Sequence, residues 1–173
     1  AAQVTSLCFD PLTNMAGMYT LASGGADMQV NLWQIPPVPL RVPPLGAQRE
    51  KLRKKYHKVV ATLAGHKFAV VALSCDGAFL CGASGNLICV WKEWRMRNPE
   101  QRGPVLRVQS NPEHRLWHES CVHSICVRGG TAAVGCENGQ IVTWDLANLG
   151  LPDLNMTNCQ RNLRRVLYGE TIK

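Results

Sequence analysis

Three stretches of the chain decide its fold: LASGGADMQVNLW at residues 21–33, LCGASGNLICVW at residues 80–91 and VGCENGQIVTW at residues 134–144. Each begins with a short apolar run, continues through a turn rich in Gly, Asn, Asp or Ser, and ends in an alternating segment closed by Trp. Alternation with a period of two, bounded by turn residues, is typical of β-strands. Gly and Asn accept positive φ in tight turns, so each stretch predicts a β-hairpin.

The hairpins belong to a larger repeat. The pattern His-x-x-x-Val-x-x-aliphatic starts at His66 before the second stretch and at His118 before the third, at matching distances. Successive hairpins give four-stranded antiparallel blades, and a blade cannot bury both of its faces alone. Blades therefore stack radially into a propeller, and we expect an all-β fold of this kind.

The repeated units resemble WD40 repeats. The chain contains the Trp-Asp pair at residues 144–145, the Gly-His pair at residues 65–66, and Asp27 at the place of the family's turn aspartate. The resemblance implies a propeller of about seven blades, of which this chain holds about three, as a fragment or one part of a larger propeller. It also implies structural roles for the motif residues. These are Asp27, Trp33, His66, Trp91, His118, Trp144 and Asp145.

The chain also departs from the family pattern. Gln34 and Lys92 stand where the aspartate of the Trp-Asp pair is expected, and Gly85 and Asn138 replace the turn aspartate. Trp117 replaces the Gly that precedes His in the Gly-His pair. We therefore expect the family's buried His–Ser–Asp–Trp hydrogen-bond network to be incomplete in every unit, which makes the blades less rigid.

The repeat divides the chain into blades and inserts. The segments are a first blade at 1–35, a Pro-rich then basic insert at 36–58, a second blade at 59–92, a basic insert at 93–115, a third blade at 116–149, and a connector with the start of a fourth blade at 150–173. Inserts between repeats commonly map to one face of a propeller, and that face is often the binding face.

Positive charge is concentrated in the inserts. The chain has a net charge of +7. Residues 36–58 hold seven Lys or Arg against one Glu, and residues 92–115 hold six against three Glu. Such local charge predicts contact with nucleic acid, an acidic protein or an import receptor, or else a solvated loop. Few aromatic residues interrupt the basic run at 49–58, which argues against sequence-specific binding of single strands.

Trp94 in the second insert has two alternative interpretations. A Trp beside arginines has the composition of a binding hot spot, but it also suits packing at the outer edge of a blade. The candidate partner-binding residues are Arg49, Lys51, Arg53, Lys54, Lys55, Lys58, Trp94, Arg95 and Arg97.

Several classes of site are not expected. The eight cysteines lie mostly on predicted strands in apolar settings, which indicates a reducing, intracellular compartment rather than a disulfide framework. The His and Cys residues within 114–126 lack the spacing of a compact metal site. No nucleophile elbow, phosphate-binding loop or long apolar run is visible. We expect no catalytic residue, no cofactor, no metal and no membrane.

Within the WD40 family, the chain most resembles the WD-repeat subunit of chromatin assembly factor, with Hir-type histone regulators next. The resemblance covers residues 4–149 and rests on VTSLCF at 4–9, VVALSCDG at 70–77, VWK at 90–92 and the positions of both inserts. It implies a non-enzymatic, nuclear scaffold for histone deposition. Its partners would be a larger chromatin-assembly subunit, and histones or a histone-bound chaperone.

Two other functions stay open. The chain could be a WD40 scaffold in another complex, for example in ribosome biogenesis, RNA processing or a ubiquitin ligase. It could also bind nucleic acid weakly through its basic inserts, and such binding would weaken steeply with salt.

Overall fold

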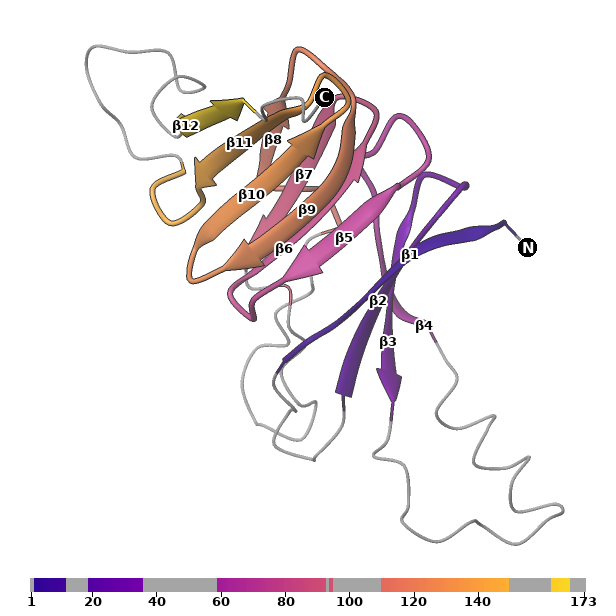
Figure 1. Ribbon diagram of the computed structural model, residues 1–173. Helices are drawn as coiled ribbons and strands as arrows, with labels where there is room; N and C mark the ends of the chain where they lie inside the picture. Colours follow the sequence, from indigo (N-terminus) through magenta and orange to yellow (C-terminus); the bar gives the residue numbers. More distant parts are fainter. Residues whose placement is uncertain are drawn as a thin grey trace, which may run out of the picture.

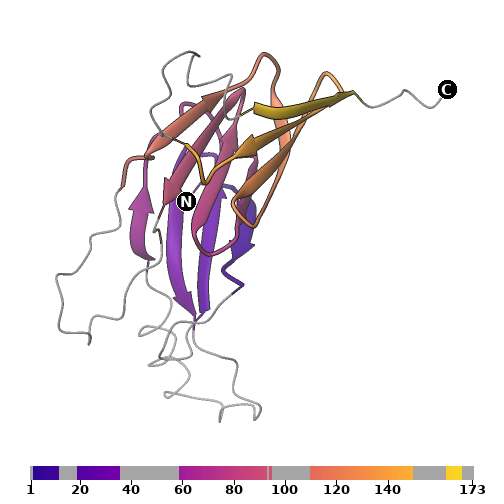
Figure 2. The ribbon, with the colours of Figure 1, turned by 90° about the vertical axis from the view of Figure 1, so that its left-hand side faces the viewer.

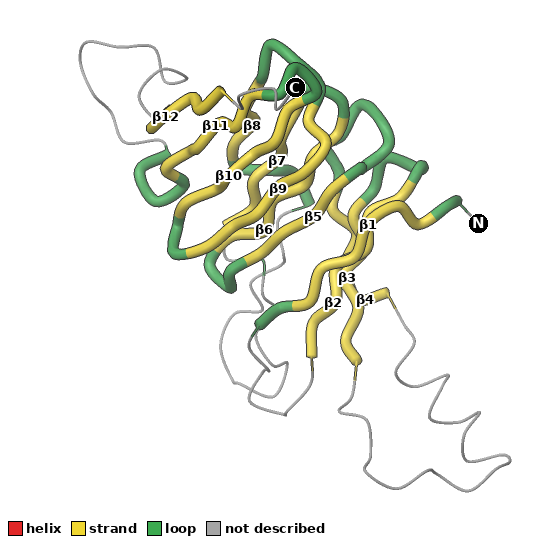
Figure 3. The backbone as a smooth tube through the Cα atoms, viewed as in Figure 1, coloured by secondary structure: helices red, strands yellow, loops and turns green. Residues whose placement is uncertain are grey.

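The computed structural model of the chain describes residues 2–11, 19–35, 59–92, 94 and 110–149, together with the backbone of residues 163–168. Strands and turns make up this described part, and none of it is helical (Figures 1 and 3). The predicted all-β fold is therefore confirmed. None of the described residues forms a helix that is long and apolar enough to cross a membrane.

Blade 1 is a four-stranded antiparallel sheet in which each strand pairs with the next along the chain. Its strands are β1 (Val4–Phe9), β2 (Tyr19–Gly25), β3 (Val30–Ile35) and β4 (Val59–Leu63). Strand β3 shows the predicted alternation, because Val30 and Leu32 are fully buried while Asn31 and Trp33 lie on the other face.

Blade 2 has the same order of strands. Its strands are β5 (Ala72–Cys75), β6 (Phe79–Ser84), β7 (Leu87–Lys92) and β8 (His114–Trp117). Every residue of β6 is buried, and so is every residue of β7 except the last. This burial on both faces explains why LICVWK at 87–92 is almost continuously apolar.

Blade 3 repeats the arrangement once more. Its strands are β9 (Val122–Arg128), β10 (Thr131–Cys136), β11 (Gln140–Asp145) and β12 (Leu163–Tyr168). The turn between β9 and β10 consists of Gly129 and Gly130, both with positive φ. A tight two-residue hairpin needs this conformation, so the turn follows directly from the sequence.

The three blades stack through their innermost strands. Strands β1 and β2 contact β5, and strands β5 and β6 contact β9. Figure 1 shows the sheets following one another in chain order, from indigo through magenta to orange, and Figure 2 shows them from the side. The described part of the chain is thus an arc of three propeller blades.

The sheets are offset from the sequence repeats by one strand. Strand β4, placed with the second blade at 59–92, instead pairs with β3 in blade 1. Strand β8 pairs with β7, and β12 pairs with β11, so β12 closes blade 3 and does not start a fourth blade within 150–173. The physical reason is that β3, β7 and β11 would otherwise present a row of unpaired backbone groups, which the next strand of the chain satisfies.

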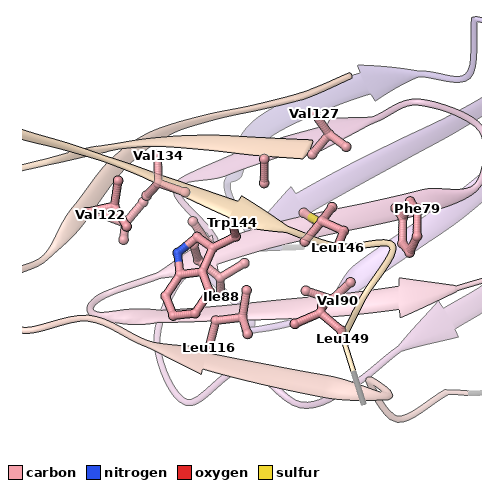
Figure 4. Packing of buried hydrophobic residues seen from close by; sticks show 14 residues of the cluster. Phe79, Ile88, Val90, Leu116, Val122, Val127, Val134, Trp144, Leu146 and Leu149 are labelled. Atoms are coloured by element: carbon pink, nitrogen blue, oxygen red, sulfur yellow. The ribbon is translucent and has the colours of Figure 1, made fainter. Parts of the chain in front are cut away.

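Two apolar clusters hold the blades together. The cluster between blades 1 and 2 contains Ala22, Val30, Leu32, Leu63, Val70, Leu73, Leu80, Leu87, Cys89, Trp91 and Trp94. The cluster between blades 2 and 3, drawn in Figure 4, centres on Trp144, Ile88, Val90 and Val134. Successive residues of β7 point alternately into the two clusters, so blade 2 is the shared centre of the core.

The outer face of blade 1 differs from these buried interfaces. Leu7 is 60% exposed and Phe9 is 58% exposed, and both lie on β1. The Phe9 ring meets the ring of Tyr19, itself exposed, edge to face at a centroid distance of 6.5 Å. This face therefore leaves aromatic and aliphatic side chains in contact with solvent.

Candidate functional site

The first candidate site is the buried pair of His66 and Trp91 between blades 1 and 2. His66 lies in the loop before β5, and its ring centroid is 5.6 Å from that of Trp91. Its Nδ1 lies 2.7 Å from Oγ of Ser84 on β6. Its Nε2 is buried and has no hydrogen-bond partner among the described residues. The indole N–H of Trp91 instead donates to the carbonyl of Ser110 at 3.3 Å.

The His66 ring fits only because residue 82 is a glycine. A Cβ atom on Gly82 would lie 2.6 Å from Nε2 of His66, closer than side-chain carbons come to such atoms. Burial, with a smaller contribution from the charge of Arg115, lowers the pKa of His66 to about 4. His66 is therefore neutral near pH 7, and it is a buried ring packed against Trp91.

The second site is the pair of His118 and Trp144 between blades 2 and 3. The ring centroids are 5.4 Å apart in an edge-to-face arrangement. The indole N–H of Trp144 donates to Nε2 of His118 at 3.1 Å, so Nε2 is unprotonated. Nδ1 faces Sγ of Cys136 at 3.8 Å. Burial lowers the pKa of His118 to about 4, which keeps this ring neutral too.

The third Trp of the repeat, Trp33, has a different partner. Its indole N–H donates to Oγ of Ser23 at 2.8 Å on the outer face of blade 1. Asp27 caps its own turn, because its Oδ1 accepts the backbone N–H of Gln29 at 3.3 Å. Among the described residues, then, Asp27 is exposed and stabilises the β2–β3 turn locally.

Two aspartates secure the other end of the blades. Asp145 is buried, and its Oδ2 accepts the side-chain amide of Asn148 at 2.8 Å. Asp76, in the β5–β6 turn, accepts the backbone N–H of Phe79 through Oδ1 and that of Gly130 through Oδ2, at 3.0 and 2.9 Å. The second bond ties the turn of blade 2 to the turn of blade 3. Sequence reasoning missed Asp76, although an Asp-Gly turn was visible.

Trp94 requires a correction. The side chain is 1% exposed and packs in the cluster between blades 1 and 2. Trp94 is therefore not an exposed binding hot spot. Of the two interpretations, packing against a blade is the one that the structure supports. Its large apolar ring outweighs the neighbouring charged residues in deciding its position, since burying a Trp removes much apolar surface from water. The indole N–H has no hydrogen-bond partner among the described residues.

The other candidate partner-binding residues lie outside the described residues. They are Arg49, Lys51, Arg53, Lys54, Lys55, Lys58, Arg95 and Arg97. The strands that flank them are described, however. The first insert joins the end of β3 to the start of β4, and the second joins β7 to β8. By antiparallel pairing, both inserts leave the blades at the same rim.

The opposite rim carries an exposed aromatic cluster that sequence reasoning missed. We call Lys67, Phe68 and Trp117 the aromatic patch. Phe68 is 56% exposed and Trp117 is 45% exposed. Nζ of Lys67 lies 5.4 Å from the Trp117 ring centroid, a cation–π distance. The Phe68 ring covers Gly85, whose φ is +54°. The sequence does give one sign of this patch, because Trp117 stands where the Gly-His pair of the repeat has its glycine.

Hydrogen bonds hold the backbone next to Trp117 of the aromatic patch. The backbone N–H of His118 donates to the carbonyl of Asn86 at 2.9 Å, and the side-chain amide of Asn86 donates to the carbonyl of His118 at 3.1 Å. These bonds fix the end of β8, and hence Trp117, against the β6–β7 turn. Trp117 therefore sits on hydrogen-bonded backbone, which lowers the entropy lost when a partner binds.

The described residues contain no group of three or more His, Cys, Asp or Glu side chains that could hold a metal ion. His118 is engaged by Trp144, as described above, and Cys121 and Cys126 are exposed. Among the described residues, the arrangement presents exposed surfaces and buried structural pairs.

Comparison with known proteins agrees with this architecture. Residues 1–34 and 57–92 match the family model described as WD domain, G-beta repeat. A search of curated proteins gives no match. Among solved structures, the chain is similar to the crystal structure of the computationally designed Ika4 protein, with a TM-score of 0.55 and 17% identity over 84% of this chain and 67% of that chain.

A second similar structure is the WD40 domain of coronin from Toxoplasma gondii. Its TM-score is 0.58 at 15% identity, over 84% of this chain and 32% of that chain. At these identities the similarity concerns the fold alone, and WD40 repeats indicate a protein-interaction scaffold. Two segments of the chain therefore match the WD40 repeat, and its described residues form three four-stranded blades of a β-propeller arc.

Proposed function

We propose that this chain is a non-enzymatic scaffold of a nuclear chromatin-assembly complex, and that it holds a larger acidic subunit on its aromatic patch during histone deposition. The observation that carries the binding role is the pair of exposed rings, Phe68 and Trp117, on rigid turns beside Lys67. Exposed aromatic residues on ordered backbone, next to a basic side chain, are the usual anchors of protein interfaces.

Charge favours an acidic partner over free histones. The chain has a net charge of +7, and its two inserts hold most of the excess Lys and Arg. Histones are themselves strongly basic, so direct contact between histones and the inserts is opposed by like-charge repulsion. An acidic subunit, or a histone chaperone that shields its histones, would bind without this repulsion. The scaffold would then reach histones through this intermediate partner.

The chromatin assignment rests on the sequence resemblance. The order of blades and inserts, together with VTSLCF at 4–9 and VWK at 90–92, resembles the WD-repeat subunit of chromatin assembly factor. The same scaffold could serve a complex of ribosome biogenesis, RNA processing or ubiquitin ligation. These complexes differ in what co-purifies with the chain, so the identity of the partners decides between them.

The basic inserts favour one further candidate function, direct binding of nucleic acid. Phosphate contacts release counterions, so this function predicts a binding constant that falls steeply with salt. The inserts leave the blades at one rim, and the aromatic patch lies at the opposite rim. Variants of the patch should therefore leave nucleic-acid binding intact, whereas variants of Lys54 and Lys55 should reduce it.

The deciding experiment is affinity purification of the full-length protein from its own cells, followed by quantitative mass spectrometry. Three forms are compared: wild type, the double variant Phe68→Ala with Trp117→Ala, and the control Met28→Ala. Met28 is 44% exposed on the β2–β3 turn of blade 1. We expect a larger acidic subunit and core histones with wild type and control, and their loss with the double variant.

Other results would contradict the proposal. Recovery of ribosomal, splicing or ligase subunits without histones would overturn the chromatin assignment and leave the scaffold role standing. Recovery of chromatin-assembly subunits at equal levels from all three forms would overturn the aromatic patch as their binding surface.

A further inference from the structure

Two cysteines meet at the junction between blades 1 and 2. Cys8 lies on β1 and Cys75 is the last residue of β5. Their Sγ atoms are 3.0 Å apart, although 67 positions separate them in the sequence. Both thiols are reduced in this structure and both residues are only partly buried. The sulfur atoms need to approach by only about 1 Å to reach the bonding distance of a disulfide.

We propose that Cys8 and Cys75 form a dithiol site that reacts with low-molecular-weight disulfides and closes into a disulfide between blades 1 and 2. Two different sheets hold these two thiols together. The site is independent of the partner that the scaffold binds, and it does not involve the aromatic patch.

The surroundings assign the two sulfurs different roles. Hydrogen bonding from the Cys75 thiol lowers the pKa of Cys8, while burial opposes this effect less strongly. The Cys75 thiol also lies 3.2 Å from the carbonyl oxygen of Phe9, to which it can donate. The thiolate is the nucleophilic form of cysteine, so Cys8 is the attacking sulfur and Cys75 the resolving sulfur.

Oxidised glutathione reacts with this pair of cysteines in two steps. The Cys8 thiolate attacks one sulfur of the glutathione disulfide, which forms a mixed disulfide and expels one glutathione thiolate. Cys75 then loses its proton and attacks the Cys8 sulfur, which forms the Cys8–Cys75 bond and expels the second glutathione thiolate. Two cysteine thiols lose two electrons and two protons, and one glutathione disulfide becomes two glutathione thiols.

Two other thiols of the blades are less suited to this reaction. Cys81 and Cys89 are fully buried. Burial raises the pKa of Cys89 to about 12, and it raises the pKa of Cys81 as well. Thiols of this kind are almost entirely protonated near pH 7 and are shielded from glutathione.

The next junction along the arc offers an internal comparison. By strand register, Ser74 of blade 2 corresponds to Cys8, and Val127 of blade 3 corresponds to Cys75. At this place, Oγ of Ser74 accepts the backbone N–H of Val127 at 2.9 Å. The same repeat position therefore holds an ordinary hydrogen bond in one junction and two adjacent thiols in the other. The stacking of blades requires no cysteine there.

The direct test counts thiols in the whole protein after treatment with oxidised glutathione. Reduced protein has eight cysteines, and reaction with maleimide in denaturant after oxidation should reveal six thiols. Peptide mapping should identify one cross-link, between Cys8 and Cys75. The oxidised protein should also unfold at a higher temperature than the reduced protein, because the bond closes a long loop in the unfolded chain.

Serine variants separate this site from general oxidation. Cys8→Ser and Cys75→Ser should each keep seven thiols after oxidation, whereas the control Cys126→Ser should fall from seven to five. Circular dichroism of each reduced variant checks that the blades are folded. The proposal is overturned if Cys8→Ser loses as many thiols as wild type, if the cross-link joins other cysteines or two chains, or if glutathione stays on Cys8 without attack by Cys75.

Discussion

The His66 and His118 sites occupy equivalent positions in two successive blades, yet they are built differently. Both histidines precede an innermost strand, both are less than a tenth exposed, and both face a Trp ring at about the same centroid distance, 5.6 and 5.4 Å. At the first site the ring bonds to a serine and the Trp bonds elsewhere. At the second site the Trp bonds to the ring directly.

The difference follows from two nearby positions on the second strand of each blade. Ser84 of blade 2 corresponds by register to Cys136 of blade 3, and each lies 18 residues after its histidine. A hydroxyl is a strong partner for Nδ1, whereas a thiol is a weak one. Gly82 corresponds by register to Val134, and the absence of a side chain at Gly82 leaves room for the His66 ring. Packing thus fixes the pair of rings, and single residues decide its hydrogen bonds.

The largest expected effect is shared by both sites and appears on acidification. Each histidine has a folded-state pKa of about 4, below the value of about 6.5 in an unfolded chain. The unfolded chain therefore binds more protons between pH 6.5 and pH 4, so the free energy of unfolding falls as pH is lowered through this window. The loss at His66 should be on the order of 3 kcal/mol.

Urea unfolding at pH 7 and at pH 4.5 measures this loss. The double variant His66→Gln with His118→Gln should be less stable at pH 7 but should lose much less stability on acidification. The single variants should lie between the two. An unchanged pH dependence in the double variant would show that other groups, His114 or the carboxylates, cause the loss.

The next effect concerns the first site alone. Gly82→Ala places a methyl group 2.6 Å from His66 Nε2, within a buried interface that cannot expand freely. Overpacking of this kind should lower the free energy of unfolding by about 2 to 3 kcal/mol. The matched control is Gly135→Ala on β10, where the nearest atom is Oγ of the exposed Ser124, at 2.5 Å. That hydroxyl can rotate away, so chemical denaturation should show a smaller loss; equal losses would refute the His66 contact.

Much of this architecture could be predicted from the sequence because it is local. Period-two alternation and the Gly-Asn and Asn-Gly turns predict the hairpins β6–β7 and β10–β11, which the structure contains. The pairing of β4 with β3 and of β8 with β7 could not be read in the same way, because it joins strands across long inserts. Sequence spacing alone does not report which earlier strand a later one meets.

The same limit applies to the candidate sites. Features set by neighbouring residues could be predicted from the sequence, whereas contacts between distant segments could not. The repeat spacing predicts the positions of His66, His118 and the Trp residues. It does not predict that the indole N–H of Trp91 donates to the carbonyl of Ser110. The sequence left exposure and packing open for Trp94, because charged residues flank it, and its burial comes from a cluster that residues of blades 1 and 2 form together. The aromatic patch likewise combines residues from a loop and from the end of β8.

A smaller effect is expected when the serine of the first site is changed. Ser84→Ala removes the partner of Nδ1 and leaves both ring nitrogens of His66 buried without a described partner. The expected loss is about 1 to 2 kcal/mol. Thr62→Val is the control, because its hydroxyl donates to Oδ1 of Asn31 at an exposed position, where water can replace it. Thermal unfolding should rank Ser84→Ala as the more damaging change, and the reverse order would contradict the comparison.

The smallest effect has the opposite sign and belongs to the second site. Cys136→Ser replaces the thiol that faces His118 Nδ1 at 3.8 Å with a hydroxyl, the group that Ser84 provides at the first site. The hydroxyl can accept the Nδ1 proton while Trp144 still donates to Nε2, so both ring nitrogens become strongly bonded. Stability should rise by about 0.5 to 1 kcal/mol. The converse change, Ser84→Cys, should lower it. If both changes destabilise, shape rather than hydrogen bonding governs the two sites, because sulfur and oxygen differ in size as well as in bonding strength.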